Sequence, residues 1–264
     1  MSTWKIEQVG KKPNLRNPIF IEGLPGIGNV GKVAVDFIID ELKAKKLYEI
    51  SSYTFPHSVF VNEDNLVELP TIEIFYKKFN SKHDLLLLAG DVQPIDEVSS
   101  YEFSEKMLDL VQQFKGKKII TLGGIGLAEI PKKPKVYCTG NSKKIIKEYQ
   151  SRIVCNELYG VVGPIVGVSG LLIGLAGKRK IDAISLLAET YGHPMFLGVK
   201  GAKAIVKILD KKLGLKLNVG KLDKEIKEVE GEIMKRTEEL TGISRKAALK
   251  KLKGKLGVEH SYIG

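Results

Sequence analysis

Cysteine is scarce in this chain of 264 residues, which contains only Cys138 and Cys155. The two residues do not form a C-x-x-C pair, and a chain of this length does not need disulfides to build a core. Neither thiol has a sequence neighbour that would mark it as activated, so both are expected to be small buried side chains. We therefore expect no disulfide scaffold, no metal and no other cofactor.

A secretory signal is also missing, because the first residues, MSTWKIEQVGKK, contain no apolar segment. We therefore expect a cytoplasmic protein. One uncharged stretch, Tyr159–Gly177, is nearly long enough to span a bilayer. Its glycines are spaced alternately three and four residues apart, so they would line one face of a helix and let another backbone come close. Glycine contributes little to membrane insertion and Pro164 lies early in the stretch, so we expect no membrane partner but a buried helix or a subunit contact.

Catalytic signatures are absent as well. The sequence contains neither H-E-x-x-H nor G-x-S-x-G, and GVSGL at 167–171 lacks the last glycine. Three residues remain as candidates for an acid or a base: Glu189 ends the apolar segment 181–190, and His57 and His193 lie in loops at strand ends. No metal-binding spacing accompanies the two histidines, so structural roles are expected for them. Glu189 is the most suggestive acid because it ends a buried strand, but it has no evident partner in the sequence.

The sequence GLPGIGNVGK, at residues 23–32, matches two nucleotide-binding patterns in part. Its last three glycines fit G-x-G-x-x-G, and residues 26–32 fit the start of G-x-x-x-x-G-K-[ST]. A P-loop, however, needs Ser or Thr after the lysine to hold magnesium, and Val33 stands there. A dinucleotide site needs an acid at the end of the second strand, which here ends in YTFPH.

We interpret this glycine loop as a structural turn. Gly26 and Gly28 would permit the tight turn, and Gly31 would permit close packing of a helix on a sheet. Weak anion affinity at the helix N-terminus is the most that such a loop would offer. The alternative hypothesis is a nucleotide-binding or phosphorylase/hydrolase-like enzyme that uses the loop with Glu189 or His57.

The chain is basic, with a formal net charge of +11. This balance favours anionic partners in general, although lysines dispersed over solvated faces would also account for it. The segment 241–257 carries six basic residues and no acidic one. It lacks interleaved aromatic residues, and no known nucleic-acid-binding signature accompanies it. We therefore expect no nucleic-acid partner.

Segments with strand character alternate with segments of helical spacing along most of the chain. Residues 84–91 and 117–126 are apolar, as strands covered on both faces are, and 29–46 has apolar residues at helical spacing. The pattern predicts an α/β fold, a three-layer sandwich with a largely parallel sheet, over residues 1–218. Residues 219–264 are expected to form C-terminal amphipathic helices and a flexible docking tail, because 219–240 has heptad-like apolar positions among Lys and Glu and 241–257 has a second, weaker amphipathic pattern.

Six motifs, read together, resemble one protein family. In chain order they are IEGLPGIGNVGKVAVDFII, FPHSVFV, DLLLLAGDVQP, ITLGGIGL, GPIVGVSGLLIGLA and LLAETYGHP. They resemble the proteasome assembly chaperone family in its archaeal form, over about residues 15–215. The resemblance implies a non-enzymatic α/β domain similar in topology to the phosphorylase/hydrolase sandwiches. It also implies homo-oligomers whose C-terminal tails dock on the α-ring of the 20S proteasome.

In such relatives the docking signal is a C-terminal tripeptide of a hydrophobic residue, Tyr and any residue. The tyrosine enters a pocket between α-subunits, and the terminal carboxylate pairs with a lysine there. This chain ends Ser261-Tyr262-Ile263-Gly264, so the tyrosine is third from the end and Ser261 is not hydrophobic. We predict that these four residues bind the partner and that Tyr262 is the anchor. A single aromatic anchor on a flexible end binds weakly, but several tails on one ring bind tightly.

Overall fold

A computed structural model of the chain describes residues 4–80, 83–155, 157–158, 163–194, 196–224 and 226–227. The chain divides into two compact units, Met1–Val219 and Gly220–Gly264. The first unit contains the sheets. The predicted docking residues Ser261, Tyr262, Ile263 and Gly264 lie outside the described residues, as does most of the predicted C-terminal extension.

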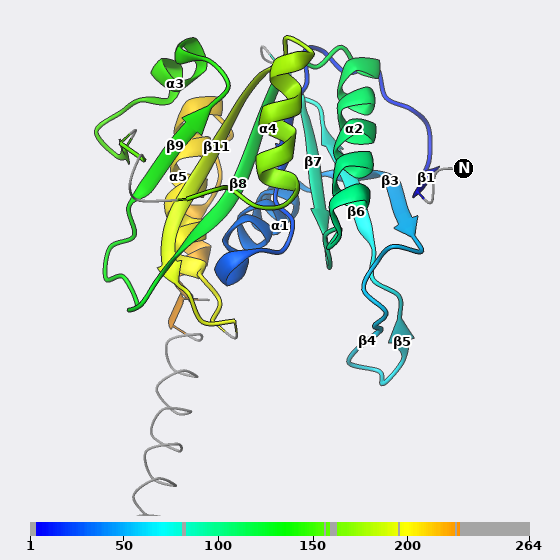
Figure 1. Cartoon of the computed structure of the whole chain (residues 1–264), viewed down its shortest axis with the longest axis horizontal. Coiled ribbons are helices and arrows are strands. Elements are labelled where there is room, and N and C mark those ends of the chain that lie inside the picture. Colours follow the sequence, from blue (N-terminus) through cyan, green and yellow to red (C-terminus); the bar gives the residue numbers. More distant parts are fainter. Residues whose placement is uncertain are drawn as a thin grey trace, which may run out of the picture. The chain divides into compact units, whose positions relative to one another are not determined.

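A mixed sheet of nine strands runs through the first unit, and two further strands, β4 and β5, form a small separate sheet (Figure 1). The strands are β1 (Trp4–Gln8), β2 (Ile19–Glu22), β3 (Lys45–Ser52), β4 (Phe60–Val61), β5 (Val67–Glu68), β6 (Ile72–Lys77), β7 (Leu85–Gly90), β8 (Lys118–Leu127), β9 (Val136–Gly140), β10 (Val154–Cys155) and β11 (Asp182–Tyr191). Their order in the large sheet is β1-β3-β6-β7-β2-β8-β11-β9-β10.

The centre of the sheet is parallel and its flanks are mixed. Strands β7, β2, β8 and β11 run side by side in one direction. On one flank β6, β3 and β1 follow by antiparallel pairing, and on the other β9 pairs antiparallel with β11. The predicted α/β class is confirmed, but the parallel arrangement is limited to the centre. Parallel central strands are buried on both faces, which explains why β7 is apolar throughout.

Helices pack on both faces of the large sheet (Figure 1). The described helices are η1 (Ile27–Asn29), α1 (Val30–Leu42), α2 (Glu97–Gln113), α3 (Lys143–Tyr149), α4 (Val168–Lys178), α5 (Val199–Leu213) and η2 (Val219–Lys221). Helix α1 contacts α5 on one face, and α2 contacts α4 on the other. Because α1, α2 and α4 each begin near the carboxyl ends of the parallel strands, their first turns surround that edge of the sheet.

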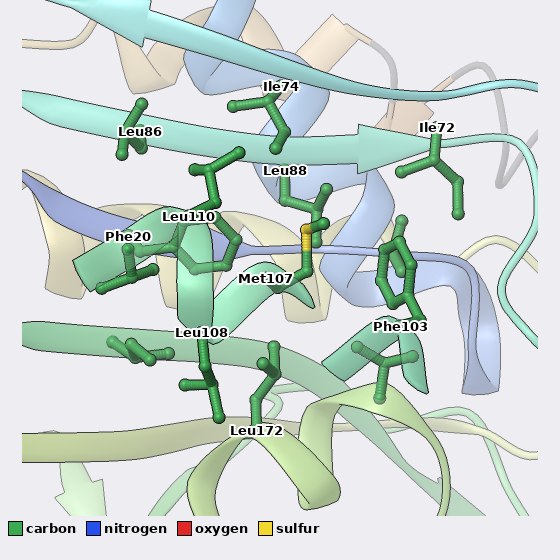
Figure 2. Packing of buried hydrophobic residues seen from close by; sticks show 14 of the residues in the cluster. Phe20, Ile72, Ile74, Leu86, Leu88, Phe103, Met107, Leu108, Leu110 and Leu172 are labelled. Atoms are coloured by element: carbon green, nitrogen blue, oxygen red, sulfur yellow. The ribbon is translucent and has the colours of Figure 1, made fainter. Parts of the chain in front are cut away.

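The core between the sheet and α2 consists of large apolar side chains. Phe103, Met107 and Leu108 of α2 are fully buried and pack in one cluster with Leu172 of α4 (Figure 2). The strand residues of this cluster include Phe20, Ile72, Ile74, Leu86 and Leu88. Burial of one such side chain contributes roughly 1.5–3 kcal/mol, so the cluster holds the helix pair on the sheet.

Only the later part of the glycine-rich stretch is described as a helix. Helix α4 begins at Val168, after Gly167, whose φ of 89° favours glycine. The larger side chains of α4, such as Val168 and Leu172, are buried, whereas Gly174 and Gly177 are exposed. The expectation that the glycine face is buried in the fold is therefore wrong for these two glycines. A subunit contact on the glycine face stays a prediction.

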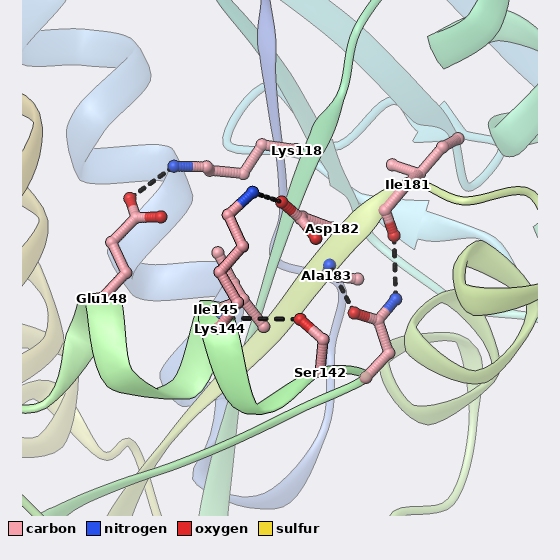
Figure 3. Close-up of polar contacts among 9 residues, drawn as sticks. Lys118, Ser142, Lys144, Ile145, Glu148, Ile181, Asp182 and Ala183 are labelled. Carbon is pink, nitrogen blue, oxygen red and sulfur yellow. Dashed lines mark hydrogen bonds and ion pairs between the residues drawn. The ribbon is translucent and has the colours of Figure 1, made fainter.

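Helix α3 covers the β9 side of the sheet and is held there by polar contacts (Figure 3). The Lys118 Nζ on β8 lies 2.5 Å from the Glu148 Oε1 on α3. Asn141, just before the helix, donates from Nδ2 to the Ile181 carbonyl at 2.8 Å and accepts at Oδ1 from the Ala183 N–H at 3.1 Å. An exposed ion pair contributes little, so the Asn141 bridge is the more important attachment.

Candidate functional site

A cavity of about 810 Å³ opens at the carboxyl ends of the central strands. Its walls are the turn after β2, the loop after β7, the end of β8 and the segment 163–171 at the start of α4. Open α/β sheets commonly bind ligands at this edge. The glycine loop, residues 23–32, borders the cavity, so its geometry decides whether a phosphate site exists.

The glycines of this loop are used for packing. A Cβ on Gly31 would lie 2.4 Å from the Leu122 carbonyl oxygen, so α1 approaches β8 because residue 31 has no side chain. Gly28 has a φ of 61°, and its carbonyl accepts a hydrogen bond from the Gly198 N–H at 2.7 Å. A Cβ on Gly28 would also meet Thr190 at 2.7 Å. The interpretation as a tight turn with close helix–sheet packing is confirmed at Gly28 and Gly31.

Lys32 has partners other than those a P-loop lysine needs. Its ammonium donates to the Gly90 carbonyl at 3.0 Å and lies 3.2 Å from Asp36 and 3.6 Å from Asp91. Burial raises the pKa of Asp36, and the Lys32 charge opposes this rise. A P-loop lysine must reach the phosphates of the nucleotide. The geometry therefore gives no support to nucleotide binding by the loop.

Glu22, the last residue of β2, is a fully buried carboxyl next to the cavity wall. Its Oε1 accepts from the Leu24 N–H at 3.0 Å, and its Oε2 accepts from the Ser169 Oγ at 2.8 Å. Burial raises the pKa of Glu22 to about 7, although both hydrogen bonds act to lower it. Near neutral pH this carboxyl is therefore partly protonated, and it ties the turn after β2 to the first turn of α4.

Hydroxyl side chains continue the polar row from Glu22 across the sheet. Thr121 of β8 is the register partner of Glu22, and Ser185 of β11 is the register partner of Thr121. Thr139 of β9 stands opposite Ser185. Thr121 and Ser185 are fully buried, and neither hydroxyl has a hydrogen-bond partner among the described residues. An unpaired buried polar group costs about 1–3 kcal/mol, a cost that applies to Thr121 and Ser185 and not to the hydrogen-bonded Glu22.

Ser169 and Glu22 stand in the relation of a nucleophile and a base. The hydroxyl is within hydrogen-bond reach of a carboxyl that the Leu24 N–H orients, and Ser169 lies on the cavity wall. Ser169 is the serine of the incomplete G-x-S-x-G match at 167–171, and it lies in the first turn of α4. Backbone N–H groups at a helix start can stabilise an oxyanion. The arrangement could support acyl transfer.

The candidate acid and bases from the sequence do not come together. Glu189 accepts from the Lys135 N–H at 2.9 Å and from the Tyr137 hydroxyl at 3.2 Å, which attaches β9 to β11. His193 stacks on Tyr191, with ring centroids 5.7 Å apart. His57 is exposed in the segment after β3. None of the three lines the cavity, so the structure does not unite them with the glycine loop.

Both cysteines are free, and Cys138 is buried whereas Cys155 is partly buried. Burial, followed by the neighbouring Cys155, raises the pKa of the Cys138 thiol. A raised pKa keeps the thiol protonated and unreactive. Cys138 is therefore a small core side chain, as expected.

The described residues contain no group of three or more His, Cys, Asp or Glu side chains that could hold a metal ion. None of the helices in this part of the chain is long and apolar enough to cross a membrane.

Glu22 and the polar row were missed by sequence reasoning. The available signal was a carboxylate inside an otherwise apolar strand, IFIE. Its hydroxyl partners lie on other strands or on α4, so only the strand register and the packing of α4 reveal them.

Solved structures resemble this fold closely. PbaB of Pyrococcus furiosus, an archaeal proteasome activator, is 38% identical, with a TM-score of 0.81 over 90% of this chain and 100% of that chain. PbaA of the same organism, an archaeal homolog of proteasome-assembly chaperone, is 25% identical, with a TM-score of 0.72 over 94% of this chain and 98% of that chain. An uncharacterized protein of Methanocaldococcus jannaschii is 30% identical over 216 residues, which is 82% of this chain and 81% of that protein.

The resemblance that the sequence motifs indicated is confirmed by these matches. The profile of the PAC2 family matches residues 20–237, which is most of the chain. Its homologues include a proteasome activator and a homolog of proteasome-assembly chaperones. This chain is a member of the PAC2 family.

Proposed function

We propose that the chain is a non-enzymatic proteasome assembly chaperone or activator that docks its C-terminal tails on the α-ring of the 20S proteasome. The similarity to PbaB, at 38% identity over 90% of this chain, carries the proposal. We also propose that it acts as a cytoplasmic homo-oligomer. In this proposal residues 1–218 form the body and residues 219–264 present the tail.

The geometry of the glycine loop gives no support to the nucleotide-binding alternative. The glycine loop packs against β8, and Lys32 is engaged by Gly90, Asp36 and Asp91. The sequence of the tail supplies Tyr262, preceded by six basic residues in the segment 241–257. A basic segment beside an aromatic anchor suits an acidic partner surface, because charge steers the encounter and the aromatic ring provides the contact.

Binding to immobilised 20S core particles tests the proposal. Surface plasmon resonance should detect binding of the full chain at micromolar concentration. The chain that ends at His260, without the last four residues, should bind at least about ten times more weakly, since each engaged tail loses its anchor. Equal binding by both proteins would reject tail docking, and no binding by the full chain would reject the proposed partner.

A hydrolase-like activity is the second candidate, favoured by the hydrogen bond between Ser169 and Glu22 at the cavity wall. A fluorophosphonate probe reacts with activated serines and would test it. Under the chaperone proposal the probe leaves the protein unlabelled. Labelling that disappears in both Ser169→Ala and Glu22→Gln would favour the enzyme instead.

A further inference from the structure

The β4–β5 hairpin exposes apolar side chains on both of its faces. We define the hairpin as residues 58–69; in Figure 1 it extends from the β3–β6 side of the sheet. Its six large apolar residues are between 45% and 75% exposed: Val59, Phe60, Val61, Leu66, Val67 and Leu69. Clustered exposed apolar residues mark an interaction surface. An isolated two-stranded hairpin is also only marginally stable in water, so a covering partner would stabilise it.

The tip of the hairpin has a defined shape. The Asn62 Oδ1 accepts hydrogen bonds from the Asp64 and Leu66 N–H groups, both at 3.0 Å. The Asn62 Nδ2 donates to the Glu68 carboxylate at 2.7 Å. The apolar residues are therefore presented on a preorganised hairpin, which lowers the entropy lost on binding.

The hairpin is acidic in a chain that is otherwise basic. It carries Glu63, Asp64 and Glu68 and no Lys or Arg, whereas the whole chain has a net charge of +11. Neither Glu63 nor Asp64 has an ion-pair partner among the described residues. An acidic surface of the kind that would attract the basic segment 241–257 would repel this hairpin. A basic surface suits it, and a second copy of the chain provides one.

The complementary feature is the loop between β8 and β9, which we define as the 128–135 loop. It exposes Lys132, Lys133 and Lys135, with Glu129 as its single acid. Ile130 is 44% exposed beside the lysines. The loop therefore presents an exposed apolar side chain surrounded by positive charge. The hairpin presents exposed apolar side chains beside negative charge, so the two surfaces are complementary.

The fold places the hairpin and the loop on opposite flanks of one body. The hairpin connects β3 to β6 on one side of the parallel centre, and the 128–135 loop leads into β9 on the other. Strands β3 and β8 run in the same direction, so both features leave the sheet at the same end (Figure 1). Four strands, β7, β2, β8 and β11, lie between β6 and β9, so the hairpin is paired here with the loop of another copy.

We propose that the hairpin of one copy docks on the 128–135 loop of the next copy, head to tail. A contact between two different patches repeats from copy to copy and closes into a ring when the rotation permits. The proposal rests on the homo-oligomer in the proposed function and names the surface that builds it. Val61 and Val67, which are cross-strand partners and share one face of the hairpin, would contact Ile130, while Glu63 and Asp64 would face Lys132 and Lys133.

Charge reversal tests this contact. The hairpin variant is Glu63→Lys with Asp64→Lys, and the loop variant is Lys132→Glu with Lys133→Glu. Light scattering at micromolar concentration should give an oligomer for the wild type and a monomer mass for either variant alone, because like charges then face each other. An equimolar mixture should regain a larger mass, since the lysine hairpin meets the glutamate loop and the reverse pair matches too.

A matched control is Lys207→Glu with Lys211→Glu on the exposed side of α5, which should keep the wild-type mass. Circular dichroism should show that all variants are folded, as the substituted side chains are exposed. The proposal is overturned by a monomeric wild type, by variants that keep the wild-type mass, or by a mixture that stays monomeric. Loss of core-particle binding without a change of mass would instead assign the hairpin to that partner. The masses are measured without the proteasome, so this experiment can reject the contact between copies without rejecting tail docking.

Discussion

At the scale of single residues, Glu22 is the side chain whose environment most alters its chemistry. Its pKa is raised from an ordinary value of 4.5 to about 7 by burial. The folded state therefore holds a proton that the unfolded state has released between these two pH values. As pH rises through this window, the free energy of unfolding must decrease, because ionising the buried carboxyl costs more in the folded state.

Replacement of Glu22 by Gln should remove this pH dependence. The amide keeps the shape and can still hydrogen-bond to the Leu24 N–H and the Ser169 hydroxyl, but it does not ionise. From pH 4 to pH 8 the wild type should lose on the order of 3 kcal/mol more unfolding free energy than Glu22→Gln. Urea unfolding at both pH values measures the difference. Parallel pH profiles would show that Glu22 titrates normally.

Lys32 leads to a second prediction at the residue scale, the absence of nucleotide binding. Calorimetry with millimolar ATP, GTP or NAD should show no saturable heat, because the lysine is held by Gly90, Asp36 and Asp91. Val33 also stands where a magnesium-binding hydroxyl would be needed. Micromolar binding that Lys32→Ala abolishes would contradict this prediction and revive the enzyme hypothesis.

At the scale of elements, local pattern predicted the central strands and most helices, since long apolar runs and helical spacing are properties of the segment itself. The beginning of α4 could not be predicted this way. Glycine spacing is compatible with a helix, but glycine has weak helix propensity, so tertiary contacts decide where the helix begins. The antiparallel flanks were missed because strand order depends on pairings between distant segments. The cavity and the polar row at Glu22 could not be predicted for the same reason, because their residues come from different strands and from α4.

Two glycines of α4, one turn apart, should respond oppositely to alanine. A Cβ on Gly170 would lie 2.2 Å from the Ile165 carbonyl oxygen, whereas a Cβ on Gly174 would meet no heavy atom within 4 Å. Gly170→Ala should destabilise the protein by about 1–3 kcal/mol. Gly174→Ala should stabilise it by about 0.5–1 kcal/mol through helix propensity. Thermal unfolding measures both.

Light scattering of Gly174→Ala tests whether the glycine face of α4 takes part in assembly. In the proposed ring, the hairpin and the 128–135 loop make the contact, so Gly174→Ala should keep the wild-type mass. A smaller mass for Gly174→Ala would assign the glycine face of α4 to a subunit contact.

At the scale of the whole molecule, the body and the tail are interpreted from different kinds of evidence. The fold of the body follows from its packing, and its family is evident from motifs spread over residues 15–215. The docking role proposed for Ser261 to Gly264 rests on the resemblance alone, because the sequence of a short tail does not by itself identify a partner. In the proposed oligomer both parts are needed, because a ring of bodies would present several weakly binding tails to one symmetric target.

The position of Tyr262 allows a test that separates the tyrosine from the terminal carboxylate. Tyr262→Ala should weaken binding to 20S core particles by at least about ten-fold, since one aromatic anchor is lost from every tail engaged. Deletion of Gly264 alone makes Tyr262 the second residue from the end. If the carboxylate pairs with a lysine of the α-ring, this deletion should keep or strengthen binding.

Binding should also weaken as salt rises, because the six positive charges of 241–257 act through a screened field. Surface plasmon resonance at two salt concentrations measures these effects, and an unchanged affinity for Tyr262→Ala would place the contact on the α/β body.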